Sequence, residues 1–293
     1  MKVVTGSSSL ALGRELALSL GAQTVDVVFE KHSGGFPDGE RYVRLLSEVA
    51  GEHVAIVQST HPDPKIVELF LLQDAVMEAG ASRLSLVIPY FGYGRQDKKF
   101  ELGEPISARS LARRLQIQAD SIFTVSVHNP QVLTHFDIPA KDVSGMPALA
   151  RYLRGRGIEV VLAPDQNAER FARDVGDALG AEWDFLEKTR KDSYTVAVKP
   201  KALDVKGRTV AIVDDVISTG TTIATAARVL REQKARRVVA ACVHGLFAGD
   251  ALTRLQACDE VVATDTLLSP ATRVSVAPEL AAAFTEGVPE RSD

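Results

Sequence analysis

The chain has 293 residues, a length that favours about two domains. Hydrophobic residues make up 45% of it and charged residues 25%, which excludes a disordered, collagen-like or low-complexity protein. The 34 basic and 38 acidic side chains leave a formal charge of −4 without a basic block, so we expect no nucleic-acid partner.

Features that would place the chain in or across a membrane are missing from the sequence. No apolar run approaches the roughly 18 residues that a membrane span needs. Arg14 and Glu15 interrupt the apolar stretch at the N-terminus, which makes it a poor signal peptide. Cys242 and Cys258 form neither a metal-ligand spacing nor a disulfide framework. We therefore expect a cytoplasmic protein without a membrane partner.

Short runs rich in β-branched residues alternate with amphipathic segments along most of the chain. The runs that predict strands are 54–57, 84–88, 122–127, 160–162, 210–213 and 238–243. The segments that predict helices between them are 66–79, 108–115, 167–179 and 223–233. This alternation indicates an α/β fold with mainly parallel sheets flanked by helices, in which ligands bind beyond the carboxyl ends of the strands.

The pattern breaks at residues 142–147, which favours a boundary between domains 1–144 and 145–293. A weak internal repeat suggests that the two halves are similar, because residues 78–84 (EAGASRL) and 232–238 (EQKARRV) each lead into an apolar run. We also expect that about the last 15 residues can pack back on the N-terminal domain.

The strongest local signal is an apolar strand that ends at Asp214 and Asp215 and is followed by a turn rich in hydroxyl groups. The hydroxyl side chains there are Ser218, Thr219, Thr221 and Thr222. With the backbone N–H groups at a helix start, they form a cradle for a phosphate, which Gly220 lets approach closely. The two carboxylates can accept hydrogen bonds from vicinal sugar hydroxyls. A series of helix caps is the alternative interpretation, but capping explains one hydroxyl and not four beside paired acids.

This segment resembles the phosphoribosyl-pyrophosphate loop of type I phosphoribosyltransferases and of ribose-phosphate pyrophosphokinases. It is not a Walker loop, because no Gly-Lys-Ser/Thr follows the turn. By itself it leaves open whether an enzyme makes phosphoribosyl pyrophosphate or consumes it. For the whole chain, the resemblance implies two similar phosphoribosyltransferase-like domains.

A second motif follows the predicted strand at residues 84–88 and reads PYFGYGRQDKK. The arginine fork of Arg95 can bind phosphate, and Gln96 can hydrogen-bond a base or a phosphate. An aromatic turn followed by a solvated charge run is the plainer interpretation. The run resembles the ATP-binding signature of ribose-phosphate pyrophosphokinases, which implies that Arg95, Gln96 and Asp97 bind ATP.

A third motif, FPDGE, begins at Phe36 and would by itself be only a good turn. It resembles a loop of the same family in which the aromatic ring stacks on adenine and the acids bind nucleotide from a neighbouring subunit. That resemblance implies that Phe36, Asp38 and Glu40 bind ATP. It also implies a homo-oligomer with shared active sites, either a dimer or a tetramer or hexamer built from dimers.

Two further residues resemble metal- and substrate-binding positions of the family. His128 stands where the family has an ATP and magnesium histidine, although the usual D-x-H pattern is here Ser126-Val127-His128. Asp165 resembles the acid of the S-P-D loop, which implies contact with ribose 5-phosphate and with Mg²⁺. A surface histidine and an acid that caps a turn are the alternative interpretations.

The segment that starts at Glu187 reads EKTR and resembles the beginning of the family's catalytic loop. The resemblance implies that Lys188 and Arg190 flank the transferring group, and the KTR form is typical of archaeal-type members. Charge density alone would favour a solvated loop.

Together the motifs predict transfer of the diphosphoryl group of ATP to the C1 hydroxyl of ribose 5-phosphate, with Mg²⁺ as cofactor and AMP as the second product. Two alternatives remain open from the sequence. One is a phosphoribosyltransferase that consumes phosphoribosyl pyrophosphate, and the other is a catalytically silent regulatory subunit of the same fold, suggested by Ser126 and Gln166.

Overall fold

The chain forms two compact units, which the computed structural model describes in residues 1–30, 36, 38–190, 196–200 and 204–287. Side chains are described in all of these except residues 187–190 and 196–200. Unit 1 comprises Met1–Ser144 and Val276–Asp293, and unit 2 comprises Gly145–Ser275. None of the helices in the described ranges has both the length and the apolar character needed to cross a membrane.

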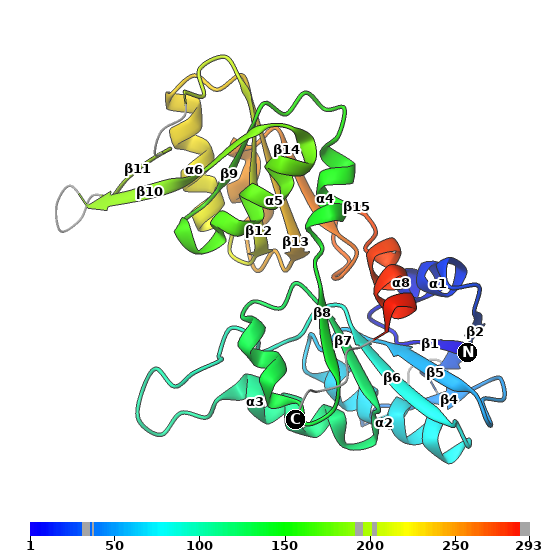
Figure 1. Cartoon of the computed structure of the whole chain (residues 1–293). Coiled ribbons are helices and arrows are strands. Elements are labelled where there is room, and N and C mark those ends of the chain that lie inside the picture. Colours follow the sequence, from blue (N-terminus) through cyan, green and yellow to red (C-terminus); the bar gives the residue numbers. More distant parts are fainter. Residues whose placement is uncertain (31–35, 37, 191–195, 201–203, 288–293) are drawn as a thin grey trace. The chain divides into compact units, whose positions relative to one another are not determined.

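Unit 1 is built on a parallel sheet, which in the described residues has the strand order β2-β1-β5-β6-β7-β8 (Figure 1). Its strands are β1 (Lys2–Thr5), β2 (Gln23–Val25), β5 (His53–Val57), β6 (Arg83–Ile88), β7 (Ser121–Val125) and β8 (Ala140–Val143). Its helices are α1 (Leu10–Ser19), α2 (Pro64–Glu78), α3 (Ser107–Leu115), α8 (Ala277–Glu286) and the 3₁₀ turns η1 (Gln116–Gln118) and η2 (Pro130–His135). A separate antiparallel pair joins β3 (Val27–Val28) to β4 (Arg44–Leu45).

Helices cover both faces of this sheet, which explains why its central strands β5, β6 and β7 are almost entirely buried. Ile122 packs into the core that β5 and β6 form with α2 and α3. The next residue on the strand, Phe123, points to the other face and stacks on Phe284 of α8, with ring centroids 4.1 Å apart. The C-terminal helix α8 therefore belongs to unit 1, where it also contacts α1.

Unit 2 has a larger sheet, with the order β11-β10-β9-β12-β13-β14-β15 in the described residues. All neighbouring strands are parallel except β10 and β11, which form an antiparallel hairpin. The strands are β9 (Val160–Ala163), β10 (Glu182–Arg190), β11 (Val196–Pro200), β12 (Thr209–Ile217), β13 (Arg237–Gly245), β14 (Glu260–Thr264) and β15 (Thr272–Val274). The helices are α4 (Met146–Leu153), α5 (Glu169–Leu179), α6 (Thr221–Glu232), α7 (Ala251–Arg254) and the 3₁₀ turns η3 (Gln166–Ala168) and η4 (Leu255–Ala257).

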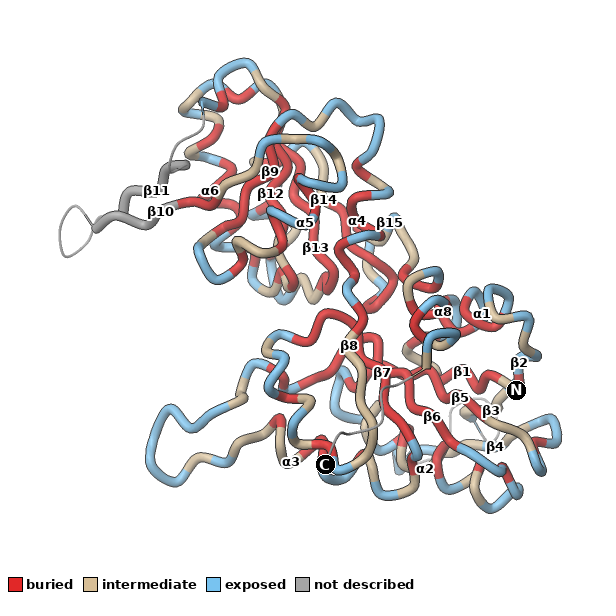
Figure 2. Tube along the Cα trace, viewed as in Figure 1, coloured by how far each residue is buried: buried red, intermediate tan, exposed pale blue. Residues whose placement is uncertain are grey.

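Figure 2 shows the same distribution of burial in each unit, with buried central strands and exposed loops and outer helix surfaces. Each fully buried leucine or isoleucine contributes about 1.5–3 kcal/mol to folding. Apolar burial on both faces of each sheet therefore stabilises the units. Because this burial is in the middle of the strands, polar residues can lie at the strand ends.

The weak internal repeat of the sequence corresponds to the same turn in both units. After α2 the chain turns through Gly80 at φ +82°, and after α6 it turns through Lys234 at φ +64°. The following residue, Ala81 or Ala235, donates its N–H to the carbonyl five residues earlier in each case. This pattern ends a helix and directs the chain into the next parallel strand.

The predicted strands and helices are confirmed, with differences at their ends. The strand predicted to end at Asp214 and Asp215 instead continues through both acids as β12, which ends at Ile217. The prediction carried one strand through residue 127, but β7 ends at Val125 because Ser126 adopts φ +41°. The prediction also began a helix at residue 167, where the chain first forms the short turn η3 before α5 begins.

Candidate active site

In unit 2, the turn between β12 and α6 lies at the carboxyl end of a parallel strand, as the sequence predicts. Gly220 adopts φ +72° and lies immediately before the first residue of the helix. A β-carbon at this position would lie 3.2 Å from the carbonyl oxygen of Ala251 and 3.2 Å from Cγ of Leu255. The left-handed backbone conformation strongly favours glycine here, and the close contacts add to that preference.

The hydroxyl groups of this turn surround the helix start on its accessible side. Thr219, Thr221 and Thr222 are exposed and Ser218 is half-buried. The Oγ1 atoms of Thr219 and Thr221 lie 3.3 Å apart. Arg254 donates from Nη1 to the Thr219 carbonyl at 3.0 Å, which fixes the turn from α7. Hydroxyl groups and amide donors thus lie together where an anion is favoured by the helix.

Three carboxylates gather beside the turn, two of them within the last four residues of β12 and one just after β9. Asp214 is half-buried and Asp215 is 5% exposed. Burial raises the pKa of Asp214 well above its usual range, and the negative charges of Asp215 and Asp165 raise it further. A carboxyl group whose pKa is raised in this way suits a site whose ligand brings hydroxyl donors or a cation.

Backbone donors hold each of these acids in place. Asp214 accepts from the N–H of Asp215 at 2.9 Å, and Asp215 accepts from the N–H of Val216 at 2.8 Å. Asp165 accepts from the N–H of Asn167 at 3.1 Å and so also caps η3. The capping interpretation of Asp165 is therefore correct for this hydrogen bond.

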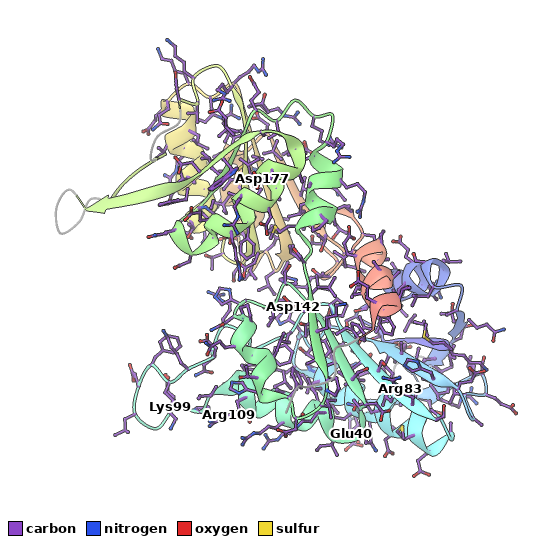
Figure 3. The ribbon with its side chains drawn as sticks, viewed as in Figure 1. Glu40, Arg83, Lys99, Arg109, Asp142 and Asp177 are labelled. Carbon is purple, nitrogen blue, oxygen red and sulfur yellow. The ribbon has the colours of Figure 1, made fainter. Side chains whose placement is uncertain are left out.

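In unit 1, the PYFGYGRQD motif leaves the end of β6 as a tight turn. Thr60, after β5, anchors it by donating to the Tyr90 carbonyl at 3.2 Å and by accepting from the N–H of Gly92 at 2.7 Å. Arg95 is exposed beyond this anchored part. Gln96 accepts from the hydroxyl of Ser107 at the start of α3. The charged residues that follow form an exposed loop, where Figure 3 labels Lys99.

His128 lies in the next loop along the sheet edge, after β7, and is exposed. The two loops are joined directly, because Asn129 donates its side-chain amide to the carboxylate of Asp97. The structure thus brings the predicted residues Arg95, Gln96, Asp97 and His128 to one edge of the unit 1 sheet.

The FPDGE loop is described at Phe36 and from Asp38 onward. Phe36 makes an edge-on contact with Tyr42, with ring centroids 5.9 Å apart. Asp38 accepts from the N–H of Glu40 at 3.1 Å, which forms the expected tight turn. A cavity of about 550 Å³ lies between residues 39–41 and the first turns of α2. Asp63, on the rim of this cavity, accepts from the hydroxyl of Tyr93 at 2.9 Å, which connects the start of α2 with the PYFGYGRQD turn.

Lys188 and Arg190 belong to β10, in the hairpin that extends the unit 2 sheet. Lys188 pairs with Val198 and Arg190 with Val196 across the hairpin. The side chains of both lie outside the described residues, so the structure gives only their backbone positions.

Among the described residues, no group of three or more His, Cys, Asp or Glu side chains is arranged to hold a metal ion. Mg²⁺, however, is usually bound by one or two carboxylates together with substrate phosphates and water. The oxygen donors beside the unit 2 turn fit that requirement, because Asp165 and Asp214 lie close enough for their charges to interact.

Several polar residues of these edges were missed by the sequence analysis. Thr60, Asp63, Asn129 and Asp142 each hydrogen-bond a predicted motif or its neighbour. Their common signal is that each comes at or just after the end of a parallel strand, or at the start of the helix that follows it. Which motif each of these residues contacts depends on the positions of β5, β7 and β8 relative to one another, which the sequence does not show.

The fold and the strand–turn–helix site define an enzyme of the phosphoribosyltransferase-like α/β class. Residues 1–118 match the family model described as the N-terminal domain of ribose phosphate pyrophosphokinase, and residues 146–270 match the phosphoribosyl transferase domain. A ribose-phosphate pyrophosphokinase of Methanopyrus kandleri is 43% identical over 97% of this chain and 98% of its own length. A second, from Thermococcus kodakarensis, is 42% identical over 89% of this chain and 92% of its own.

A solved structure agrees with these sequence relatives. Phosphoribosylpyrophosphate synthetase from Mycobacterium smegmatis superposes with a TM-score of 0.82 and 31% identity, covering 98% of this chain and 99% of its own. The chain belongs to the ribose-phosphate pyrophosphokinase family. It is an enzyme of that type, and the family predicted from its motifs is confirmed.

Proposed function

We propose that the chain transfers the β,γ-diphosphoryl group of ATP to ribose 5-phosphate, giving 5-phosphoribosyl 1-diphosphate and AMP. The observation that carries the proposal is the β12–α6 turn, where phosphate donors adjoin three carboxylates. Family membership and the ATP-binding motif of unit 1 distinguish synthesis from consumption of the product.

Unit 2 binds ribose 5-phosphate in this proposal. The 5-phosphate accepts hydrogen bonds from the N–H groups of residues 220–222 and from the hydroxyls of Ser218, Thr219, Thr221 and Thr222. Asp214 and Asp215 accept hydrogen bonds from the vicinal ring hydroxyls. Because these hydroxyls are neutral donors, they relieve the repulsion between the two acids without needing a protein cation.

Unit 1 binds ATP through the loops that follow the carboxyl ends of β6 and β7. Arg95 contacts phosphate oxygens through its planar fork, and Gln96 and His128 hydrogen-bond the nucleotide. Phe36 stacks on adenine, with Asp38 and Glu40 nearby, in the site of an adjacent subunit. The hydrogen bond from Asn129 to Asp97 suggests that Asp97 orients this edge as well as binding nucleotide.

The reaction forms a bond between the C1 oxygen of the sugar and the β-phosphorus of ATP, and it breaks the bond from that phosphorus to the oxygen that leaves with AMP. Lys188 and Arg190 stabilise the charge that develops on these oxygens. Mg²⁺ bound to the substrate phosphates would supply further neutralisation of phosphate charge, with Asp165 of unit 2 and His128 of unit 1 each proposed to contact it.

Product analysis tests the proposal. The purified chain is incubated with Mg²⁺, ATP and ribose 5-phosphate, and AMP and phosphoribosyl pyrophosphate are measured together. Equal amounts of the two products are expected. A phosphoribosyltransferase would instead release pyrophosphate from phosphoribosyl pyrophosphate and a base, and a silent regulatory subunit would give no turnover at all.

The proposal includes a homo-oligomer with shared sites, built from dimers as a dimer, tetramer or hexamer of the 31.5 kDa chain. Mixing two inactive variants, Phe36→Ala and His128→Ala, tests this directly. If Phe36 serves the neighbouring site, mixed dimers contain one intact site, and about a quarter of wild-type activity returns after subunit exchange. No recovery, with exchange verified by mass, would place Phe36 in its own subunit's site.

A cytoplasmic location is also part of the proposal. The two cysteines, Cys242 and Cys258, are both buried and free. Unpaired thiols are usual in a reducing compartment.

A further inference from the structure

The turn that carries His128 has a backbone that the local sequence does not favour. Ser126 adopts φ +41° and is 6% exposed, a conformation that costs a non-glycine residue about 1–3 kcal/mol. Its N–H donates to the carbonyl of Val143 on β8 at 2.9 Å. Such a turn persists only where neighbouring groups hold it.

Asp142, which Figure 3 labels, lies on β8, and its carboxylate holds this turn. Its Oδ1 accepts from the hydroxyl of Thr124 at 2.6 Å and from the N–H of Val127 at 3.0 Å. Hydrogen bonds to an ionised carboxylate are roughly twice as strong as neutral ones. Val127, the residue directly before His128, is thereby fixed both by this bond and by its side chain in the core.

The bond to Val127 is not needed to join the two strands. The backbones of β7 and β8 already pair from Ile122 with Ala140 to Val125 with Val143. Val127 lies beyond the last of these pairs. The hydrogen bond from its N–H to the Asp142 carboxylate therefore holds a residue of the turn against β8, outside the paired part of the sheet. On the other side of His128, Asn129 is held by Asp97 of the PYFGYGRQD motif.

We infer that Asp142 is a positioning residue, whose carboxylate sets the backbone of Val127 and so aims His128 at the bound nucleotide. The inference rests on the proposed nucleotide-binding role of His128. Asp142 itself does not need to touch ATP, because it acts through the two residues that follow Ser126.

Two substitutions separate hydrogen bonding from simple filling of space. Asp142→Ala removes both bonds and is expected to weaken binding of Mg·ATP about tenfold, since a misaligned contact loses most of its contribution. Asp142→Asn keeps an acceptor at Oδ1 and is expected to weaken it by no more than about threefold. Neither change is expected to alter binding of ribose 5-phosphate.

Asp120 provides a matched control at the opposite end of the strands, just before β7 begins. It accepts from the N–H of Leu84 at 2.7 Å, so it also joins a carboxylate to a backbone donor beside a strand. Asp120→Ala is expected to lower stability without weakening Mg·ATP binding.

The experiment measures Mg·ATP dissociation by calorimetry and hydrogen exchange at the Val127 amide, for the full chain and each variant, with His128→Ala alongside. The inference predicts weaker binding and faster Val127 exchange in Asp142→Ala, with rescue in Asp142→Asn. Unchanged binding in Asp142→Ala, equal losses in Asp120→Ala, or wild-type binding in His128→Ala would overturn it. Because binding is read without turnover, failure of the proposed reaction would show separately, as a wild-type chain that binds ATP but releases no AMP.

Discussion

Gly220 lies between β12 and α6 in a left-handed conformation, with Ala251 and Leu255 against the position of an absent side chain. We expect Gly220→Ala to raise the KM for ribose 5-phosphate at least tenfold, because the methyl group displaces the turn that presents the phosphate donors. The backbone strain should also lower the free energy of unfolding by about 1 kcal/mol or more.

Gly207 is the control for this substitution, because it has φ +71° but no atom of the described residues lies within 4 Å of the place that a β-carbon would take. Gly207→Ala should lower stability in urea unfolding and leave the KM for ribose 5-phosphate unchanged. Equal effects of the two substitutions on KM would show that the Gly220 turn does not bind the sugar phosphate.

Asp214 should make the folded protein less stable as the pH rises. Burial and the adjacent acids raise its pKa in the folded state, so between its ordinary pKa and that raised value the native state binds more protons than the unfolded chain. Stability is therefore lost as pH increases through this window. Asp214→Asn should increase the free energy of unfolding at pH 7 by about 1 kcal/mol or more, measured without ligands or Mg²⁺.

Asp259 gives the opposite sign and serves as the comparison. Burial pushes the pKa of Asp259 up, but the N–H of Val238 and the guanidinium of Arg231 outweigh this and lower it. Asp259→Asn should therefore be less stable than wild type at neutral pH, and its deficit should shrink as the pH falls. If Asp214→Asn behaved in the same way, the acids of the turn would not be strained by mutual repulsion.

At the scale of elements, the regular strand–helix alternation could be predicted because each element has its own apolar period. The strands β6, β12 and β13 are buried on both faces and therefore read as continuous apolar runs. The turn at Ser126 could not be predicted, because its conformation depends on Val143 and Asp142, which follow it by 16 or more residues. The β12–α6 turn was predictable because its glycine, hydroxyls and acids are contiguous.

The β10–β11 hairpin carries Lys188, whose proposed role is testable by kinetics. Lys188→Ala should lower kcat about 10²–10³-fold while the fold stays intact, because a charge that acts on the transition state is removed. Lys206→Ala, at an exposed position before β12, is the control and should retain wild-type turnover. Near-normal turnover of Lys188→Ala would remove Lys188 from the catalytic role.

At the scale of the whole molecule, α8 completes a unit that begins more than 270 residues earlier. Its Phe284 stacks on Phe123 and its Glu286 lies 2.8 Å from the ammonium group of Lys141. The sequence predicted that the C-terminal segment can pack back, but it could not name the contact, because a half-buried phenylalanine on a short helix has many possible partners. For the same reason, the sequence does not predict the contacts that Thr60, Asp63, Asn129 and Asp142 make with the motifs of the site.

Removal of this aromatic contact should destabilise the protein. Phe284→Ala is expected to lower the free energy of unfolding by about 1–3 kcal/mol, somewhat less than for a fully buried phenylalanine. Urea unfolding measures the change, with Leu268→Ala as the control, since Leu268 is 60% exposed. An equal effect of both substitutions would mean that α8 contributes little to unit 1.

The most direct test of the proposed reaction follows the β-phosphorus of ATP. With ATP labelled at that position and ribose 5-phosphate present, all transferred label should appear in phosphoribosyl pyrophosphate and none in AMP, because the C1 oxygen attacks the β-phosphorus. Label found in ADP, with only the γ-phosphoryl group on the sugar, would contradict the account.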